Sequence, residues 1–249
     1  MVDAAKGGVE RILQTLVVFS EMSGPVTARQ LAERTGLPTT TLYRQLQLLR
    51  QFGFVTDLGR ETGFVPGPVC LRLGAAAEGD GLLERIAPEE MRPLAKETGE
   101  TVALMLPARQ HVVCAETVES SLSLRCSVTR GALFPLGKGA STLAILAHLP
   151  ASAQEAALRE AGPEVAHGLR RRLEDIRRQG YATSEGELDE GVWGISAPVF
   201  GPGRLMGGLS LMAPATRAAG RQDNLIRLIV EAAGRLTARL QERTAQGGV

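Results

Sequence analysis

Apolar positions near the amino terminus recur at helical spacing. The first series follows the i, i+3, i+4, i+7, i+8 pattern of an amphipathic helix and consists of Val9, Ile12, Leu13, Leu16 and Val17. A second helix is predicted over residues 27–35, where Thr27 and Gln30 have the spacing of a capping box. Gly36 suits a left-handed helix end, and Pro38 suits the start of a third helix. The pattern therefore predicts three helices, the last two joined by a tight turn.

The third predicted helix begins at Thr39 and separates apolar from polar side chains. Its apolar face consists of Leu42, Leu46 and Leu49. Its other side is rich in hydrogen-bonding groups and carries no acid. Residues 54–56 and 63–65 can then pair as a β-hairpin. Three helices followed by a hairpin form a winged helix-turn-helix, in which the last helix usually enters the DNA major groove.

The pattern changes after this hairpin. Residues 68–79 begin with a proline, carry apolar side chains and end in small residues, which predicts a linker helix. The following helical segments are 82–98, 139–149, 152–161, 164–179 and a last helix with Leu225, Ile229, Ala233, Leu236 and Leu240 on one stripe. The strand-like segments are 101–107, 111–117, 121–127, 181–185, 192–200 and 205–212.

An α+β chain with two domains explains this order of elements. Residues 1–67 would form the winged helix-turn-helix, residues 68–79 the linker helix, and residues 80–249 an antiparallel sheet domain flanked by helices. The chain of 249 residues is 44% hydrophobic and 22% charged, as globular proteins are. It has no apolar run of membrane-spanning length and no signal-peptide pattern, so we expect a cytoplasmic protein with no membrane partner.

Charge supports DNA binding only locally. The whole chain has a net charge of +1. Residues 27–60, however, contain five arginines and only two acidic residues, Glu33 and Asp57, which gives a net charge of +3. Such a small basic footprint predicts modest, salt-sensitive affinity per protomer, so a dimer that reads two half-sites would be needed for specificity.

Enzymatic motifs are absent from the sequence. The segment from Gly131 to Gly139 looks like a phosphate loop, but it has five residues between its first two glycines and a glycine where Ser or Thr must hold magnesium. Cys70, Cys114 and Cys126 have no spacing typical of a metal site. We therefore expect no enzyme activity, no cofactor and no bound metal.

Several motifs in order resemble the IclR-type transcriptional regulators. They are VERILQTLVVFS, LPTTTLYRQLQLLRQFGFV, GFVPGPVCLRLG, PLGKGASTLAILA, GYATSEGELDEGVWGISAPVFG and GGLSLMAPATR, and they span nearly the whole chain. The resemblance implies a winged helix-turn-helix, a linker helix and a GAF-like effector domain. It also implies a homodimer or homotetramer that binds double-stranded operator DNA and a small-molecule effector, and a repressor is expected in preference to an activator.

The candidate DNA-binding residues lie on two helices and the hairpin loop. Thr40 and Thr41 can contact base edges or phosphates, and Arg44 can bind a guanine or a phosphate. Arg29 and Arg60 suit phosphate contacts, which position a protein without specifying sequence. The full set is Arg29, Thr40, Thr41, Tyr43, Arg44, Gln47 and Arg60. Tyr43 could instead pack against the hairpin, and Arg50 is expected on the solvated rear of its helix.

The resemblance also implies an effector site for a carboxylate or an aromatic metabolite. Its expected residues are Cys126, Phe134, Gly139, Ala140, Ser141, Ser184, Glu185, Val192, Gly194, Ser210 and Met212. The loop at residues 139–141 would hold an anion through backbone N–H groups. Thr142 and Leu143 replace the Gly-Lys of many members, and Met212 replaces a serine of some, which favours a more apolar ligand than a two-carbon acid. Core packing is the alternative for each apolar residue.

Two other function classes stay open. A winged helix-turn-helix can serve as a protein-interaction module that never touches DNA. The second domain could also be a small-molecule-modifying enzyme, in which Cys126 or Cys114 would be the nucleophile. Neither cysteine has a sequence signature of activation.

Overall fold

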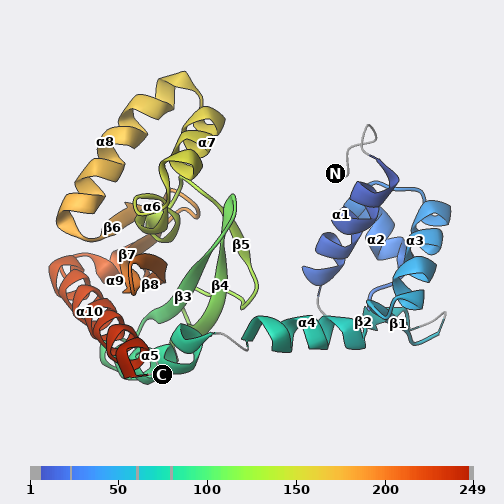
Figure 1. The fold of residues 1–249 in the computed structure, drawn as a ribbon, viewed down its shortest axis with the longest axis horizontal. Helices are drawn as coiled ribbons and strands as arrows, with labels where there is room; N and C mark the ends of the chain where they lie inside the picture. The colour runs from blue at the N-terminus through green and yellow to red at the C-terminus, as the bar shows by residue number, and fades with distance from the viewer. Residues whose placement is uncertain (1–6, 23, 60–61, 79–80, 247–249) are drawn as a thin grey trace. The chain divides into compact units, whose positions relative to one another are not determined.

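The computed structural model describes residues 7–22, 24–59, 62–78 and 81–246 (Figure 1). The chain divides into two compact units, residues 1–81 and 82–249. Among the residues described, no helix is both long and apolar enough to cross a membrane. Each unit has its own hydrophobic core.

The first unit is a winged helix-turn-helix. It contains α1 (Gly8–Ser20), α2 (Ala28–Thr35), α3 (Thr39–Gln51), β1 (Val55–Asp57), β2 (Phe64–Pro66) and α4 (Pro68–Glu78). The capping box predicted at Thr27 and Gln30 is present, and Gly36 ends α2 in the left-handed conformation with φ of 73°. These local signals confirm the predicted helix, turn and helix.

The core of the first unit joins all three of its first helices. Phe19, Leu31, Leu42 and Leu46 are buried together. The Thr15 hydroxyl donates a 2.7 Å hydrogen bond to the Gln45 side-chain carbonyl, and both residues are buried. This hydrogen bond links α1 to α3. The orientation of α3 is therefore fixed by core packing and by a hydrogen bond between two buried polar side chains.

The second unit is a six-stranded antiparallel sheet between two helical layers. Its helices are α5 (Leu82–Thr98), α6 (Ala140–Leu146), α7 (Ala151–Ala161), α8 (Pro163–Gln179), α9 (Ala215–Ala218) and α10 (Gln222–Gln246). Its strands are β3 (Thr101–Ala108), β4 (His111–Val118), β5 (Leu133–Pro135), β6 (Ala182–Glu185), β7 (Val192–Gly201) and β8 (Arg204–Pro214), in the order β5-β4-β3-β8-β7-β6.

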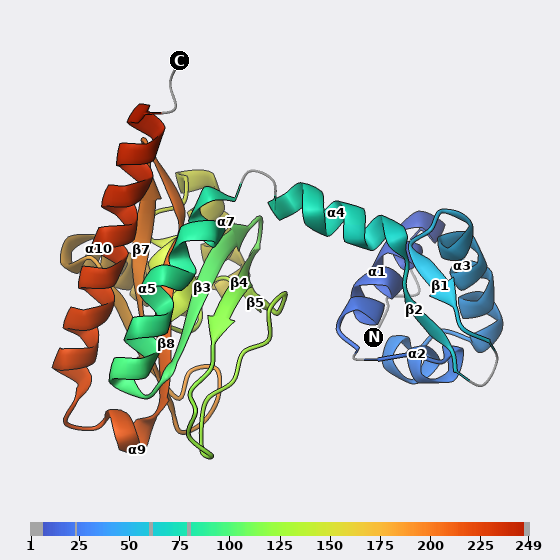
Figure 2. The same ribbon diagram turned by 90° about the horizontal axis from the view of Figure 1, so that it is seen from below.

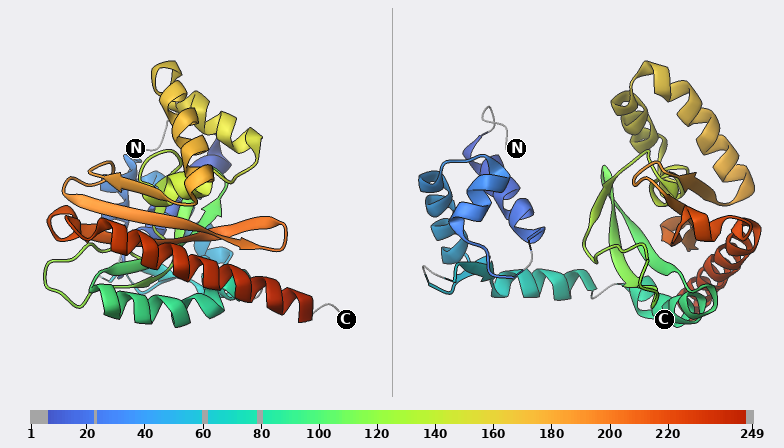
Figure 3. Two further views of the ribbon diagram at one scale, coloured as in Figure 1. Left: turned by 90° about the vertical axis from the view of Figure 1, so that its left-hand side faces the viewer. Right: turned by 180° about the vertical axis from the view of Figure 1, so that it is seen from behind.

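The two faces of the sheet are covered differently. Helices α5 and α10 lie on one face (Figure 2), and α6, α7 and α8 lie on the other (Figure 3). Alternate residues of β8 divide between the faces: Leu209 and Leu211 join the core under α5 and α10, whereas Ser210 and Met212 point to the opposite side. The α6 face is therefore the one that carries polar side chains and a cavity.

One predicted strand is wrong. Residues 121–127 form no strand; instead the short β5 pairs with β4 further along the chain. The Thr101 hydroxyl donates to the Cys126 carbonyl and accepts from the Ser120 N–H, and Arg217 donates to the Leu124 carbonyl. Side chains therefore satisfy backbone groups that a strand would pair within a sheet. The helix predicted at 139–149 is also shorter, since α6 ends at Leu146.

Candidate functional site

The exposed face of α3 carries most of the predicted DNA-binding side chains. Thr40, Tyr43, Arg44 and Gln47 are exposed, and Thr41 is half-buried. The wing loop predicted to hold Arg60 lies partly outside the described residues, and Arg60 is among those left out. Leu42, Gln45, Leu46 and Leu49 are buried on the opposite side of α3. Packing thus leaves a polar helix face free for a partner.

A groove runs between α2, α3 and the hairpin. It is lined by Thr27, Ala28, Arg29, Tyr43, Gln47, Arg50, Asp57, Gly59, Gly63 and Phe64. Tyr43 is 53% exposed and lines this groove together with Gly63 and Phe64 of the hairpin, so packing against the hairpin stays an alternative to DNA contact. Arg50 differs from expectation: it faces this groove and forms a 3.4 Å ion pair with Asp57 of β1.

The arginines of this surface differ in their partners. Arg29 pairs with Glu33 at 3.1 Å, and Arg34 pairs with Glu21 at 3.3 Å. Within the described part of the chain, Arg44 has neither an ion pair nor a side-chain hydrogen bond. Its guanidinium is therefore available to bind a base or a phosphate without first breaking an existing contact.

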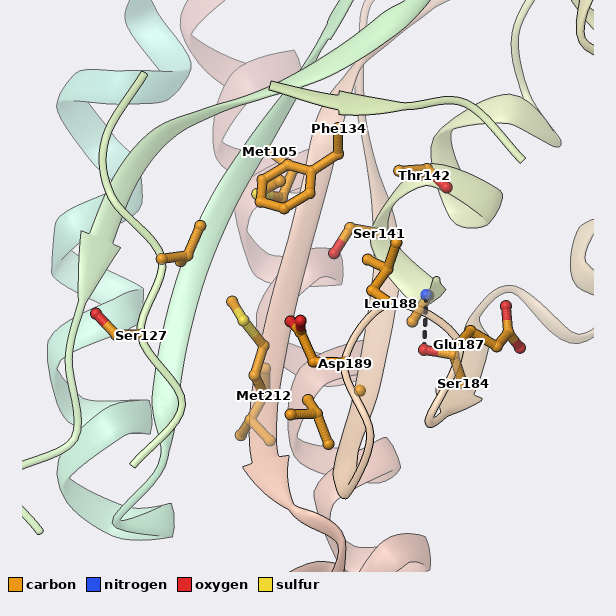
Figure 4. A pocket seen from close by; sticks show the side chains of 15 residues that line it. Met105, Ser127, Phe134, Ser141, Thr142, Ser184, Glu187, Leu188, Asp189 and Met212 are labelled. Atoms are coloured by element: carbon orange, nitrogen blue, oxygen red, sulfur yellow. Dashed lines mark hydrogen bonds between the residues drawn. The ribbon is translucent and has the colours of Figure 1, made fainter. Parts of the chain in front are cut away.

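A cavity of about 80 Å³ lies in the second unit between the sheet, α6 and the β6–β7 loop (Figure 4). Its lining is Met105, Ser127, Val128, Phe134, Ala140, Ser141, Thr142, Ser184, Glu187, Leu188, Asp189, Val192, Gly194, Leu211 and Met212. Apolar side chains from four strands, β3, β5, β7 and β8, form its walls, and hydroxyl groups from α6 and β6 supply polar contacts. This combination is typical of a small-molecule site.

Backbone N–H groups at the start of α6 already donate hydrogen bonds to side chains of the protein itself. The Ala140 N–H donates to the Ser184 hydroxyl at 2.9 Å, and the Gly139 N–H donates to the Glu187 carboxylate at 3.0 Å. Arg172 of α8 donates to the other oxygen of Glu187 at 2.6 Å. The backbone N–H groups of residues 139 and 140, which were expected to hold an anion, are therefore occupied in this structure.

The carboxylate of Glu187 is kept ionised by these contacts. Burial alone would raise its pKa, but hydrogen bonds from Arg172 and from the Gly139 N–H outweigh burial and lower the pKa below the ordinary 4.5. Figure 4 shows the Glu187 carboxylate directed away from the cavity and the Asp189 carboxylate directed into it. The two acids of this loop thus have different surroundings.

Seven of the eleven expected effector residues line the cavity: Phe134, Ala140, Ser141, Ser184, Val192, Gly194 and Met212. Four do not. The Cys126 carbonyl accepts from Thr101, Gly139 lies behind Leu188 and Glu187, and Glu185 is exposed on β6. Ser210 is fully buried and donates to the Ser196 hydroxyl at 2.9 Å.

Sequence reasoning missed the β6–β7 loop. Glu187, Leu188 and Asp189 contribute to the lining, as do Met105 and Ser127. The acidic run from Glu185 to Glu190, placed between two predicted strands, was the available signal. Nothing in that run indicates which carboxylate turns inward, because this depends on Arg172, which reaches Glu187 from α8.

The cysteines lack the properties of catalytic nucleophiles. Cys114 is fully buried, and burial raises the pKa of its thiol to about 11. Burial also raises the pKa of Cys126. A thiol must ionise to act as a nucleophile, so both residues are poorly suited to catalysis at neutral pH. Among the described residues, no group of three or more His, Cys, Asp or Glu side chains could hold a metal ion.

Two family models match the two units of the chain. The family model described as IclR helix-turn-helix domain matches residues 8–59, and the one described as Bacterial transcriptional regulator IclR C-terminal matches residues 80–238. This chain belongs to the IclR family. The family comprises transcriptional regulators, so the chain is a DNA-binding transcriptional regulator and not an enzyme.

Individual relatives share the whole organisation. The HTH-type transcriptional regulator Rv1719 of Mycobacterium tuberculosis is 28% identical, covering 90% of this chain and 89% of its own. The transcriptional repressor IclR of Escherichia coli is 25% identical, covering 91% and 87%. The crystal structure of an IclR transcriptional regulator from Alicyclobacillus acidocaldarius is 26% identical with a TM-score of 0.74, covering 93% and 97%. The α+β fold is therefore that of IclR-family regulators.

Proposed function

We propose that this IclR-family regulator binds operator DNA through α3 and that a small organic effector, bound in the cavity of the second unit, changes its operator affinity. The observation that carries this proposal is the apolar cavity, which opens beside the hydroxyl of Ser141 (Figure 4), a group without a hydrogen-bond partner in the described part of the chain. The resemblance favours a carboxylate or an aromatic metabolite. Walls that include Phe134, Met105 and Met212 support an apolar body.

On the DNA side, Arg44 is proposed to make the contact with the largest effect on specificity. Arg44 is exposed on α3. Arg29 and Arg50 each form an ion pair with an acidic side chain, whereas Arg44 forms none with the described residues. Thr40, Thr41, Tyr43 and Gln47 would supply neighbouring contacts, and Arg60 a phosphate contact from the wing. The expected complex contains a homodimer or homotetramer, because one winged domain with a local charge of +3 offers few phosphate contacts.

Repression is proposed in preference to activation. Relatives that share most of the chain include the transcriptional repressor IclR of Escherichia coli and the acetate operon repressor of Salmonella typhimurium, both 25% identical. A repressor would hold its operator until effector binding changes the spacing of two winged domains. A shift of a few ångströms suffices to misplace a half-site, since recognition helices must meet successive major grooves.

The test begins with enrichment of bound sequences from a random DNA pool, followed by affinity measurements on the recovered operator. Arg44→Ala should weaken operator binding about 10- to 100-fold, as expected for loss of a bidentate base contact. Arg92→Ala is the matched control, because Arg92 is exposed on α5 in the second unit and its removal changes net charge equally.

Circular dichroism verifies that both variants fold. If Arg44→Ala binds the operator like the Arg92→Ala control, the proposed base contact is wrong. If no sequence is enriched at all, the protein-interaction alternative gains support. Effector control is tested separately, by adding aromatic and carboxylate compounds to the operator complex and measuring the change in affinity.

A further inference from the structure

Most polar side chains around the cavity are already satisfied within the protein. The Ser184 hydroxyl accepts from the Ala140 N–H, and the Thr142 hydroxyl donates to the Lys138 carbonyl at 2.5 Å. The Ser127 hydroxyl donates to Glu119, and Glu187 accepts from Arg172. At Thr142, Ser127 and Glu187 a ligand would compete with bonds that already exist, whereas the O–H of Ser184, whose oxygen accepts from Ala140, can still donate to a ligand.

Two lining groups stand apart from this network. Within the described residues, neither the Ser141 hydroxyl nor the Asp189 carboxylate has a hydrogen-bond or ion-pair partner. Both side chains are directed into the cavity (Figure 4). A carboxylate accepts hydrogen bonds but donates none, whereas a hydroxyl does both. The free polar groups therefore call for a ligand that carries at least one hydrogen-bond donor.

The charges around the cavity oppose an anion. Among the described residues, its lining contains two carboxylates and no Lys, Arg or His. The cation that comes nearest through the hydrogen-bond network, Arg172, is bound to Glu187 and to the Thr183 carbonyl. The N–H groups of Gly139 and Ala140 are also bound. An incoming carboxylate would therefore be repelled by the Asp189 carboxylate, which is exposed to solvent, while the charges of Arg172 and Lys138 act on Glu187.

We propose that this cavity selects a small molecule with a compact apolar body and a hydroxyl or amino group that donates to Asp189, and that it discriminates against carboxylates. This inference rests on the proposed effector function and narrows its ligand class. Asp189 would be the specificity-determining residue, and Ser141 would bind the same polar group from α6. The apolar body would lie against Phe134, Met105 and Met212.

The volume of the cavity limits the size of the compounds that can test this proposal. Its 80 Å³ is about half the volume of a protein cavity known to hold benzene. Methionine side chains at 105 and 212 adapt readily to a ligand, so a ring is compatible with modest movement. We therefore choose two series with matched bodies: isobutanol, isobutylamine and isobutyrate, and benzyl alcohol, benzylamine and benzoate.

Calorimetric titration of the full-length protein with each compound tests the proposal. In at least one series, the alcohol or the amine should bind tenfold or more tightly than the acid. Comparison of the alcohol with the amine distinguishes a ligand with a neutral hydrogen-bond donor from a cationic ligand. Asp189→Asn should weaken binding of the amine about tenfold or more. It should weaken binding of the alcohol less, because the amide oxygen still accepts a hydrogen bond, and it should strengthen binding of the acid. Glu190→Gln, an exposed neighbour outside the lining, should change none of the three.

Several outcomes would overturn the ligand class. These are acids that bind as tightly as their matched alcohol and amine in both series, a preference that survives Asp189→Asn, or no binding by any of the six compounds. None of these results removes effector control itself, because the operator assay with a broader set of compounds measures that independently. If no compound alters operator affinity, the proposed function fails as well.

Discussion

Gly63 is fixed by backbone geometry and not by side-chain chemistry. It has φ of +92°, and a Cβ atom at this position would lie 2.6 Å from the Val26 carbonyl oxygen. The neighbouring Phe64 N–H donates to that same carbonyl at 2.9 Å, and the Val26 N–H donates to the Phe64 carbonyl at 2.8 Å. These two bonds attach the hairpin to the segment before α2.

Gly63→Ala should therefore destabilise the winged domain more than Gly59→Ala. Gly59 also has positive φ, +104°, but a Cβ there would meet nothing within 4 Å. The control should lose about 1–2 kcal/mol from left-handed strain alone. Gly63→Ala should lose at least about 1 kcal/mol more, because the clash weakens a backbone hydrogen bond. Urea unfolding of both variants measures the difference, and equal losses would show that the Val26 contact has no energetic importance.

The exposure of Arg44 could be predicted from the sequence, whereas the direction of the Asp189 side chain could not. Exposure and residue type placed Arg44 on the free face of α3, because its helix and its apolar stripe are local features. Asp189 was not foreseen. Its direction depends on the neighbouring Glu187, which Arg172 and the Gly139 N–H hold the other way.

At the scale of elements, the β6–β7 loop connects three parts of the second unit. Glu187 bonds to the start of α6 through Gly139 and to α8 through Arg172. Folding lowers the pKa of this carboxyl group, so its ionised form stabilises the native state at pH above the ordinary 4.5. That stabilisation should disappear as the pH falls through the lowered value.

Glu187→Gln should therefore be less stable than the native protein at pH 7, and the difference should shrink as the pH falls below about 4.5. Thermal or urea unfolding of both proteins from pH 7 to pH 3 measures this. Glu190→Gln, in the same loop but exposed, provides the comparison for loss of one charge. A destabilisation that stays constant across the pH range would exclude the ionised Glu187 as its cause.

The elements themselves were predicted with uneven success. Helices α2 and α3 have a capping box, a left-handed glycine and a clear apolar stripe, and all three signals act within a few residues. The segment 121–127 alternates apolar and polar residues as a strand does. Its backbone groups are instead bound by side chains: the Cys126 carbonyl by Thr101, the Leu122 N–H by Ser120 and the Leu124 carbonyl by Arg217. Those side chains come from up to 93 residues away, so no local pattern reports them.

At the scale of the whole molecule, operator binding should depend steeply on salt. Two protomers with a local charge of +3 each would neutralise about six phosphates, for a slope of about −5 in log K against log salt concentration. Titrations of operator DNA between 50 and 200 mM salt, roughly the range in which such effects are measured, give this slope. Analytical ultracentrifugation of the same samples gives the number of protomers bound. A slope of about −3 with one protomer per operator would contradict the dimeric complex.

Local patterns in the sequence were sufficient to predict the helix-turn-helix, most of the other elements and the resemblance to the family. These depend on periodicity, caps and glycines, whose effects extend over a few neighbouring residues. The tertiary structure decided which side chains meet. Glu187 reaches Gly139 across 48 positions of sequence and so occupies one N–H group of the expected anion site, while Asp189 is the carboxylate of this loop that faces the cavity. Polar contacts of this kind are set by long-range packing, which local patterns do not record.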